Sequence, residues 1–366
     1  FNNQKKTMIK LYQIYLIKLF LKKILYITGI FFSLVLILSV LDEINYFKDH
    51  NVNTFFPFLM TILNAPSALF EIFPFIFLIS TQFFFIELID KKELETFKSN
   101  GLSNIKILKV LFLTSLTLGI FIILIFYHFS SKFQFMYFQI KNNYSDDNKY
   151  LAVVTENGIW IKDELNNKKI IINADKLEKN YLKNVSISEF NENFKLIQII
   201  ESKKVDITNT NWIIYKPVVS KNNLTETIDQ NMFFLTHFNQ DKINSMFRNL
   251  TSLNFFELKQ LMKDYKLLGY STSEIKIHLH KLFSTPIYVG IMSIVSAIIM
   301  LNIKKNRPMI FHVASGILFS VLIYYLSYMF TLLGQNEKIP LLVSIWLPLF
   351  MFIGFILIGL VRINEK

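Results

Sequence analysis

Three long hydrophobic runs on each side of one polar segment limit what this chain can fold into more than any other feature. The first three lie before about residue 130, and the other three lie after about residue 281. Each run is roughly 20 residues or longer, which suffices for an α-helix to cross the hydrocarbon core of a bilayer. The segment between them has the composition of a water-soluble domain. The sequence therefore predicts a membrane protein with six spanning helices and an inserted extramembrane domain, a layout that favours transport, signalling or assembly across a bilayer.

The composition supports this prediction. Hydrophobic residues make up 52% of the chain and 38 of its residues are Phe, more aromatic surface than most soluble folds bury. Cys is absent, which excludes disulfides, thiolate nucleophiles and cysteine metal sites. A net charge of +12 would suggest nucleic acid in a soluble protein, but much of it flanks the hydrophobic runs. There it sets membrane orientation, so we expect no nucleic-acid partner.

The distribution of lysine predicts the orientation, because short cytoplasmic segments of membrane proteins are rich in Lys and Arg. Residues 1–23 contain six Lys and no acid, the loop at 90–109 contains five Lys, and a third basic loop lies at 304–307. All three should be cytoplasmic. The loop around Asp42 and Glu43 is acidic and should face the other side. Both termini are therefore expected in the cytoplasm and the large domain outside it.

An amphipathic helix at 8–23, with Lys on one side, is expected to lie in the membrane interface before the first span. The spans themselves are expected at 24–41, 55–88, 105–129, 282–302, 309–333 and 341–361. The second contains Pro57, Pro66 and Pro74, and prolines inside a spanning helix usually kink it. The chain is expected to divide into 1–130 with the first three spans, 131–280 as the extramembrane domain, and 281–366 with the last three.

The inserted domain has the pattern of an all-β fold. Asn157-Gly158 lies between two short β-prone segments, which is a strong hairpin signal. Further strands are expected at 169–173, 185–190, 194–201 and 212–219, followed by a helix at 254–268 that ends at Gly269. Short strands joined by polar turns at this spacing predict a sandwich or jelly roll.

Motifs for catalysis are missing. The sequence has no GxxxxGK[ST] phosphate loop, no HExxH and no GxSxG, so we expect no enzyme, no bound cofactor and no ATP hydrolysis by the chain itself. His278 and His280 are two residues apart, a spacing that points them to different faces of a helix. We therefore expect no metal site.

Glu71 is the one carboxylate deep inside an expected span. An acid inside the membrane marks a functional site by default, so a proton relay is one interpretation. The other is a packing residue at a helix kink between Pro66 and Pro74. We favour the second, because the sequence shows no buried base or second acid as its partner.

The loop between the second and third spans predicts a short helix at about 91–100. Glu93, Leu94, Phe97 and Lys98 fall roughly on one face of it, and Gly101 should end it. A solvated loop helix would explain the pattern. A coupling helix that docks into a cytoplasmic motor also explains it, because an exposed acid beside apolar anchors fits a groove lined with Arg.

With these motifs in this order, the chain resembles the LptF/LptG (YjgP/YjgQ) family of lipopolysaccharide-export permeases, and LptG most. The likeness covers nearly the whole chain. It rests on segments that follow each other in the family's order, namely Glu93 to Ser103, Pro66 to Pro74, Asn157 to Asp163, Phe190 to Asn193, Leu253 to Leu258, Gly269-Tyr270, His280 to Pro286, Gly316 to Tyr325 and Gly334 to Pro340.

The resemblance implies a membrane subunit of the ABC-type complex that exports lipopolysaccharide for outer membrane biogenesis. Its expected partners are an LptF-like subunit, two LptB ATPases, LptC and LptA, and its expected location is the bacterial inner membrane with the β-jellyroll in the periplasm. Lipopolysaccharide would enter from the outer leaflet near helices one and five. ATP-driven closure of LptB would push the coupling helix, whose expected residues are Glu93, Leu94, Phe97, Lys98 and Gly101.

Four apolar or aromatic residues of helices one and five are the candidates for the lipid-cavity wall, because acyl chains need only apolar area: Phe31, Ile37, Phe319 and Tyr324. LptG proteins often carry basic residues at the outer end of helix one, thought to meet lipid A phosphates. This chain departs from that pattern, since only Lys48 is basic there.

Two other functions remain open. ABC permeases of the lipoprotein-release or macrolide-export type usually place their large outer domain after the first of four spans, whereas this chain has three spans before the domain. A secondary transporter would need paired charges or broken helices near the midplane, and only Glu71 offers such a charge.

Overall fold

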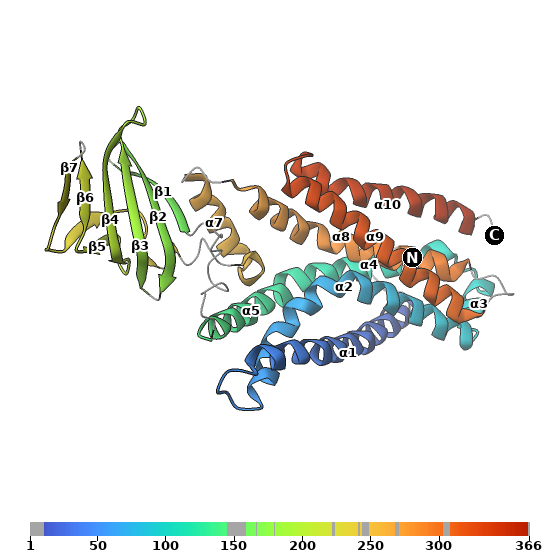
Figure 1. Ribbon diagram of the computed structural model, residues 1–366. Helices are drawn as coiled ribbons and strands as arrows, with labels where there is room; N and C mark the ends of the chain where they lie inside the picture. The colour runs from blue at the N-terminus through green and yellow to red at the C-terminus, as the bar shows by residue number, and fades with distance from the viewer. Residues whose placement is uncertain are drawn as a thin grey trace, which may run out of the picture. The chain divides into compact units, whose positions relative to one another are not determined.

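The computed structural model describes residues 11–144, 159–165, 167–178, 180–221, 224–240, 242–243, 249–267, 271–302 and 308–364. Its internal contacts divide the chain into a helical unit of residues 1–130 and 273–366 and a β unit of residues 131–272 (Figure 1). Within the described residues, six helices are long and apolar enough to cross a membrane, three before and three after the β-sheet. This confirms the predicted class, an α-helical membrane protein with an inserted all-β domain.

The helical unit contains one short helix and six spanning elements. Their bounds are α1 Leu11–Phe47, α2 Phe56–Asp90, α3 Glu93–Ser99, α4 Asn104–Phe121, α8 Ser273–Leu301, α9 Met309–Gln335 and α10 Leu341–Asn364. A π-helical turn, η1 (Ile122–Phe126), joins α4 to α5 (Tyr127–Asn142). The third span thus forms part of a helical stretch that continues well past the expected end at residue 129, and α5 leads the chain into the β unit.

Helix α1 differs from the sequence-based expectation. Separate helices were expected at 8–23 and 24–41, but Leu11–Phe47 is one unbroken α-helix of 37 residues (Figure 1). It contains no Pro, and no heavy atom lies within 4 Å of where a Cβ on Gly29 would sit. At 1.5 Å per residue the helix is about 55 Å long. That length exceeds the roughly 30 Å of a hydrocarbon core, so α1 reaches beyond the core.

Helix α2 is the centre of the helical unit. It packs against α1, α8 and α9, while α4 packs on α8. Aromatic rings fill the α1–α2 contact: the ring of Phe20 meets those of Phe77 and Phe84 edge-on, at centroid distances of 6.4 and 5.8 Å. The α4–α8 contact depends on a small residue, since a Cβ on Gly119 would lie 2.6 Å from the Cα of Pro286.

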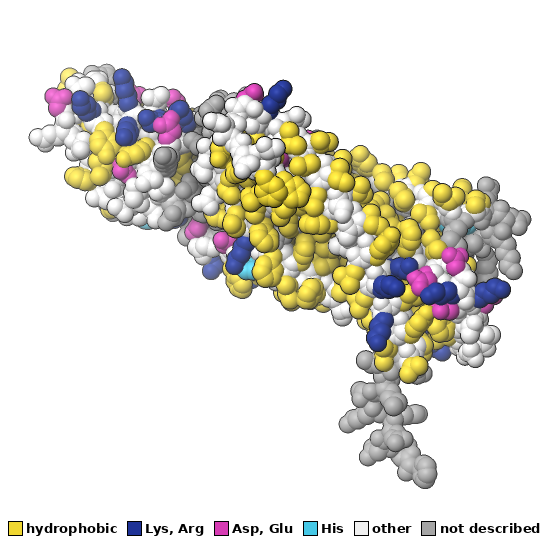
Figure 2. Space-filling model, turned by 90° about the horizontal axis from the view of Figure 1, so that it is seen from below, with side chains coloured by type: hydrophobic (Ala, Val, Ile, Leu, Met, Phe, Trp, Pro, Cys, Tyr) yellow, Lys and Arg dark blue, Asp and Glu magenta, His cyan; other side chains and the backbone are white. Residues whose placement is uncertain are grey.

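Large hydrophobic side chains remain exposed on the helices that surround this core. They are most frequent on α1, α9 and α10. Figure 2 shows them over the middle of the helical unit, with Lys, Arg, Asp and Glu gathered near one end. A soluble monomer rarely exposes so large an apolar area, whereas a bilayer covers it.

The described residues of the β unit form one eight-stranded antiparallel sheet. Its strands are β1 Ile159–Leu165, β2 Lys168–Glu178, β3 Tyr181–Phe190, β4 Leu196–Asp206, β5 Asn211–Tyr215, β6 Val218–Lys221, β7 Leu224–Thr227 and β8 Met232–Leu235. The short helix η2 (Leu250–Ser252) and helix α7 (Phe255–Leu267) follow the sheet. The expected Asn157-Gly158 hairpin turn lies outside the described residues, as does Gly269.

One expected strand is two strands in the structure. The segment 212–219 is broken at Lys216, whose φ is +45°, and at Pro217, which has no N–H for a ladder. As a result β4 pairs with β5 at one end and with β6 near its middle. This exchange of partners lets a single sheet curl, which strand periodicity alone does not reveal.

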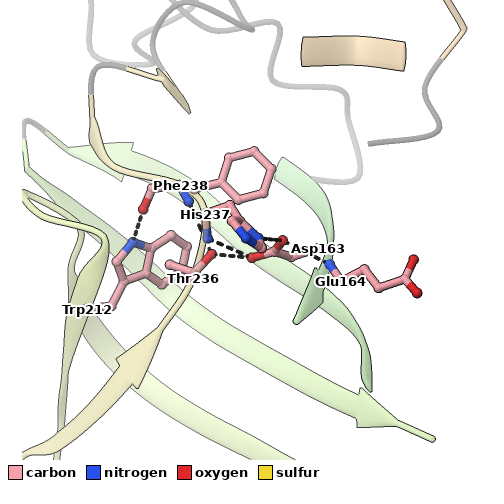
Figure 3. A network of polar contacts seen from close by, with 6 residues as sticks. All are labelled: Asp163, Glu164, Trp212, Thr236, His237 and Phe238. Atoms are coloured by element: carbon pink, nitrogen blue, oxygen red, sulfur yellow. Dashed lines mark hydrogen bonds and ion pairs between the residues drawn. The ribbon is translucent and has the colours of Figure 1, made fainter. Parts of the chain in front are cut away.

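A buried carboxylate fastens the first strand of the sheet to the segment after the last. Asp163 occupies an inward-facing position of β1 and is 1% exposed. Its Oδ2 accepts bonds from Thr236 Oγ1 at 2.6 Å and His237 N at 3.0 Å, and His237 Nδ1 lies 2.8 Å from Oδ1 (Figure 3). Burial raises the pKa of Asp163, but the hydrogen bonds from Thr236, His237 and Glu164 N outweigh it and hold the pKa below its ordinary value.

We predict that Asp163→Ala loosens this closure. The change leaves the buried Thr236 hydroxyl without its acceptor, and the expected loss of stability is about 3 kcal/mol. Because the folded-state pKa of Asp163 is lowered, its contribution is present at neutral pH and is lost as the pH falls through that pKa. Hydrogen exchange in the full chain should speed up in β1 and around Thr236.

Asp175→Ala is the matched control. Asp175 is an exposed acid of β2 that accepts one bond from Asn184, so its removal should change stability by less than about 0.5 kcal/mol. Equal exchange rates in the two variants would contradict the role given to Asp163.

Candidate functional site

The short helix α3 is fixed at both ends by local backbone geometry. Lys92, with φ +56°, turns the chain out of α2, and α3 starts at Glu93. At the other end Gly101 N donates to Lys98 O and Leu102 N donates to Phe97 O, both at 2.9 Å. This is a Schellman motif, which needs a left-handed residue. Gly101 supplies it with φ +78°, as the sequence predicted.

The faces of α3 differ from the prediction. Leu94 is buried and Glu93 and Phe97 are half-buried, whereas Lys98 is exposed. The apolar side chains turn toward the helical unit, and the half-buried acid turns with them. The solvent-facing side of the helix carries Glu95, Thr96, Lys98, Ser99 and Asn100.

Glu93 has a partner within the chain. The Tyr15 hydroxyl of α1 donates to Glu93 Oε2 at 2.6 Å. The ring of Tyr15 also lies 6.2 Å from that of Phe97. Both residues on which the coupling-helix prediction depends therefore contact the same side chain of α1, although Tyr15 lies 78 positions before Glu93 in the sequence. The sequence did not identify Tyr15, because no pattern of residues near position 15 predicts a contact with α3.

A second polar cluster lies at the end of α2, shortly before α3 in the sequence. Lys23 Nζ of α1 lies 2.5 Å from Glu87 Oε2, and Lys91 Nζ lies 2.6 Å from Glu87 Oε1. The side chains of Lys23 and Glu87 are only 19% exposed, so solvent screens their attraction less than that of a surface pair. This cluster joins α1 to the end of α2.

The candidates for the lipid-cavity wall occupy two separate places. Phe31 is half-buried and its ring meets Phe75 of α2 edge-on at 5.5 Å, while Ile37 is 60% exposed on α1. Phe319 and Tyr324 are exposed on α9. Helix α2 packs against both α1 and α9, the two helices that carry these candidates. Lys48 is exposed just after α1.

The structure corrects the account of Glu71. No charged partner was expected, but Lys281 of α8 lies within electrostatic reach of Glu71, and so does Tyr324 of α9. The three residues are exposed, and they come together because α8 and α9 both pack on α2. Lys281 was missed because the expected span began at residue 282, one position after it.

A side-chain amide inside the helical unit joins α9 to α2. Gln82 Nε2 donates to the carbonyl oxygens of His312 and Val313 at 3.2 and 3.3 Å. A Cβ on Gly316 would lie 1.9 Å from Gln82 Nε2, so this approach requires glycine. Pro66 and Pro74 lie inside the continuous helix α2.

His278 is half-buried, and its Nε2 lies 2.9 Å from the Tyr127 hydroxyl. In the described part of the chain no three His, Asp or Glu side chains are grouped as metal ligands would be.

Comparison with known proteins gives one match. A model of the family described as lipopolysaccharide export system permease LptF/LptG matches residues 14–362. The matched stretch begins in α1, ends in α10, and includes the β unit and α3. A search of curated proteins finds no match.

Proposed function

The chain belongs to the LptF/LptG family of lipopolysaccharide export permeases, and we propose that it is the LptG-like subunit through which lipopolysaccharide leaves the inner membrane. The observation that carries the proposal is the family match across residues 14–362, on a chain with three spans, a β-sheet and three spans. Opposite charges on Glu71 and Lys281 within electrostatic reach of each other would also suit a secondary transporter, but that class does not account for the match.

The energy for export has to come from another protein, because the sequence contains no phosphate loop. We propose an LptB-type ATPase that binds α3, an LptF-like subunit that completes the membrane channel, and LptC and LptA as periplasmic acceptors. The exposed side of α3 and the free Oε1 of Glu93, which accepts no hydrogen bond in the described residues, offer contacts to the ATPase.

The lipid path in this proposal follows the exposed outer surfaces of α1 and α9. Ile37, Phe319 and Tyr324 offer apolar area to acyl chains without loss of packing in the isolated subunit. Lys281 and Tyr324 each lie within electrostatic reach of Glu71, and Lys48 follows α1. The ammonium groups of the two lysines match phosphates of the lipid headgroup, and Glu71 limits the net charge at that place.

Topology is tested first, by cysteine labelling. The chain has no native Cys, so single replacements report cleanly. In whole cells Asn193→Cys, in an exposed turn of the β unit, should react with an impermeant maleimide, and Ser99→Cys, at the end of α3, should not. The physical reason is the lysine distribution around the spans. The opposite labelling pattern would refute the orientation.

A second prediction concerns the lipid path. A photocrosslinking amino acid in place of Tyr324 should capture lipopolysaccharide in cells, because this side chain is 55% exposed on the proposed wall. The same amino acid in place of Phe355, which is 66% exposed on α10, should not. Capture at both positions, or at neither, would remove Tyr324 from the path.

A third prediction concerns the coupling helix. Glu93→Ala and Phe97→Ala should each reduce retention of the ATPase on pulldown and ATP-dependent transfer of lipid to LptA. Loss of a buried charge pair or an aromatic anchor costs about 2–5 kcal/mol at an interface. Neither change alters the spans, so the protein should still accumulate in the membrane.

Glu226→Ala, at an exposed acid of β7, serves as control and should leave both activities unchanged. Wild-type retention and transfer in both α3 variants would show that α3 is an ordinary loop helix.

A further inference from the structure

We propose that Tyr15 is a positioning residue that fastens α3 to α1, so that a displacement of α3 moves the part of α1 that faces the lipid. The inference rests on the proposed role of α3 as the coupling helix. It adds a route inside this chain from the ATPase contact to the membrane cavity.

The contact between the two helices combines a polar and an aromatic component. Tyr15 Oη donates to Glu93 Oε2 at 2.6 Å, a short bond to a charged acceptor, and such bonds are stronger than neutral ones. The rings of Tyr15 and Phe97 meet one turn further along α3, at 6.2 Å and an interplanar angle of 56°. Since Glu93 and Phe97 lie at i and i+4, one side chain of α1 holds two successive turns of α3.

A second connection keeps α1 in register with α2. Lys23 lies two turns beyond Tyr15 on α1 and contacts Glu87 at 2.5 Å, and Glu87 in turn contacts Lys91 at 2.6 Å. Lys91 directly follows α2, and only Lys92 separates it from α3. With contacts at two levels, α1 can neither rotate nor slide freely against the α2–α3 segment.

Helix α1 is built to carry this displacement outward. The N-terminal part of α1 is packed against the other helices, and Leu16, Leu19, Phe20, Ile24 and Ile27 are all buried. From Thr28 to Asp42, by contrast, no residue is fully buried. The helix is unbroken between Tyr15 and Ile37, a distance of about 33 Å at 1.5 Å per residue. Beyond this stretch Glu43 and Phe47 are buried again. A continuous helix held at Tyr15 passes a rotation or an axial shift along its length to Ile37, where the packing is looser.

Tyr15→Phe in the reconstituted complex tests the inference. The variant keeps the ring on Phe97 and removes only the donor to Glu93. We expect ATPase retention and the hydrolysis rate to stay at the wild-type level, while lipid released per ATP falls about tenfold, in line with the loss of a hydrogen bond to a charged group. Tyr26→Phe is the matched control: Tyr26 lies on the same helix, is 61% exposed and makes no hydrogen bond in the described residues. It should behave as wild type.

Lipid release per ATP is the readout that a merely stabilising residue would not change. Unchanged release per ATP in Tyr15→Phe overturns the proposal. So does loss of ATPase retention in that variant, because Tyr15 would then act on docking.

A measurement without the ATPase separates this inference from the proposed function. Thermal unfolding of the full chain as a double-mutant cycle of Tyr15→Phe and Glu93→Ala should be non-additive if the two side chains are bonded. Additive effects overturn the inference even if α3 binds the ATPase. If the cycle is non-additive but the wild-type chain retains no ATPase, the bond stands, and both the coupling role of α3 and the inference built on it fail.

Discussion

Burial of α2 is the interaction on which the helical unit depends. In the most apolar stretch of α2, 61% of the residues are buried, whereas in that of α1 only 11% are. Helices α1, α8 and α9 all pack on α2. Within a bilayer the contacts between helices come from close packing and from polar groups that find partners, because lipid tails are as apolar as the side chains. Aromatic rings on the α1 side and the Gln82 amide on the α9 side meet these two requirements.

The same arrangement explains why the functional candidates gather in two places. At the end of α2 that is followed by α3, the helices α1, α2 and α3 are joined through Tyr15, Glu93 and Glu87. Elsewhere on α2, Glu71 lies within electrostatic reach of Lys281 and Tyr324. One group of residues faces the proposed motor and the other the proposed lipid. A single continuous helix, α2, connects both.

The sequence predicted the elements better than their contacts. Hydrophobic run length located all six spans, and Gly101 marked the end of α3 because a left-handed turn there requires glycine. The break at Lys216 and Pro217 was not anticipated, since both halves of that segment have strand periodicity. Glu93 was expected to be free for a partner, yet it accepts a bond from Tyr15. The roles of Glu93, Phe97 and the wall residues stay predictions.

The sequence by itself determined the spans, the all-β nature of the insert and the short helix between spans two and three. Each of these follows from local periodicity or from the length needed to cross a bilayer. Tertiary structure alone decided that α1 is one continuous helix, that Lys281 lies within electrostatic reach of Glu71 and that Tyr15 bonds Glu93 of α3. Glu71 is separated from Lys281 by 210 positions, and Tyr15 from Glu93 by 78. Pairs this far apart meet only when helices pack, and no local pattern encodes which helices do.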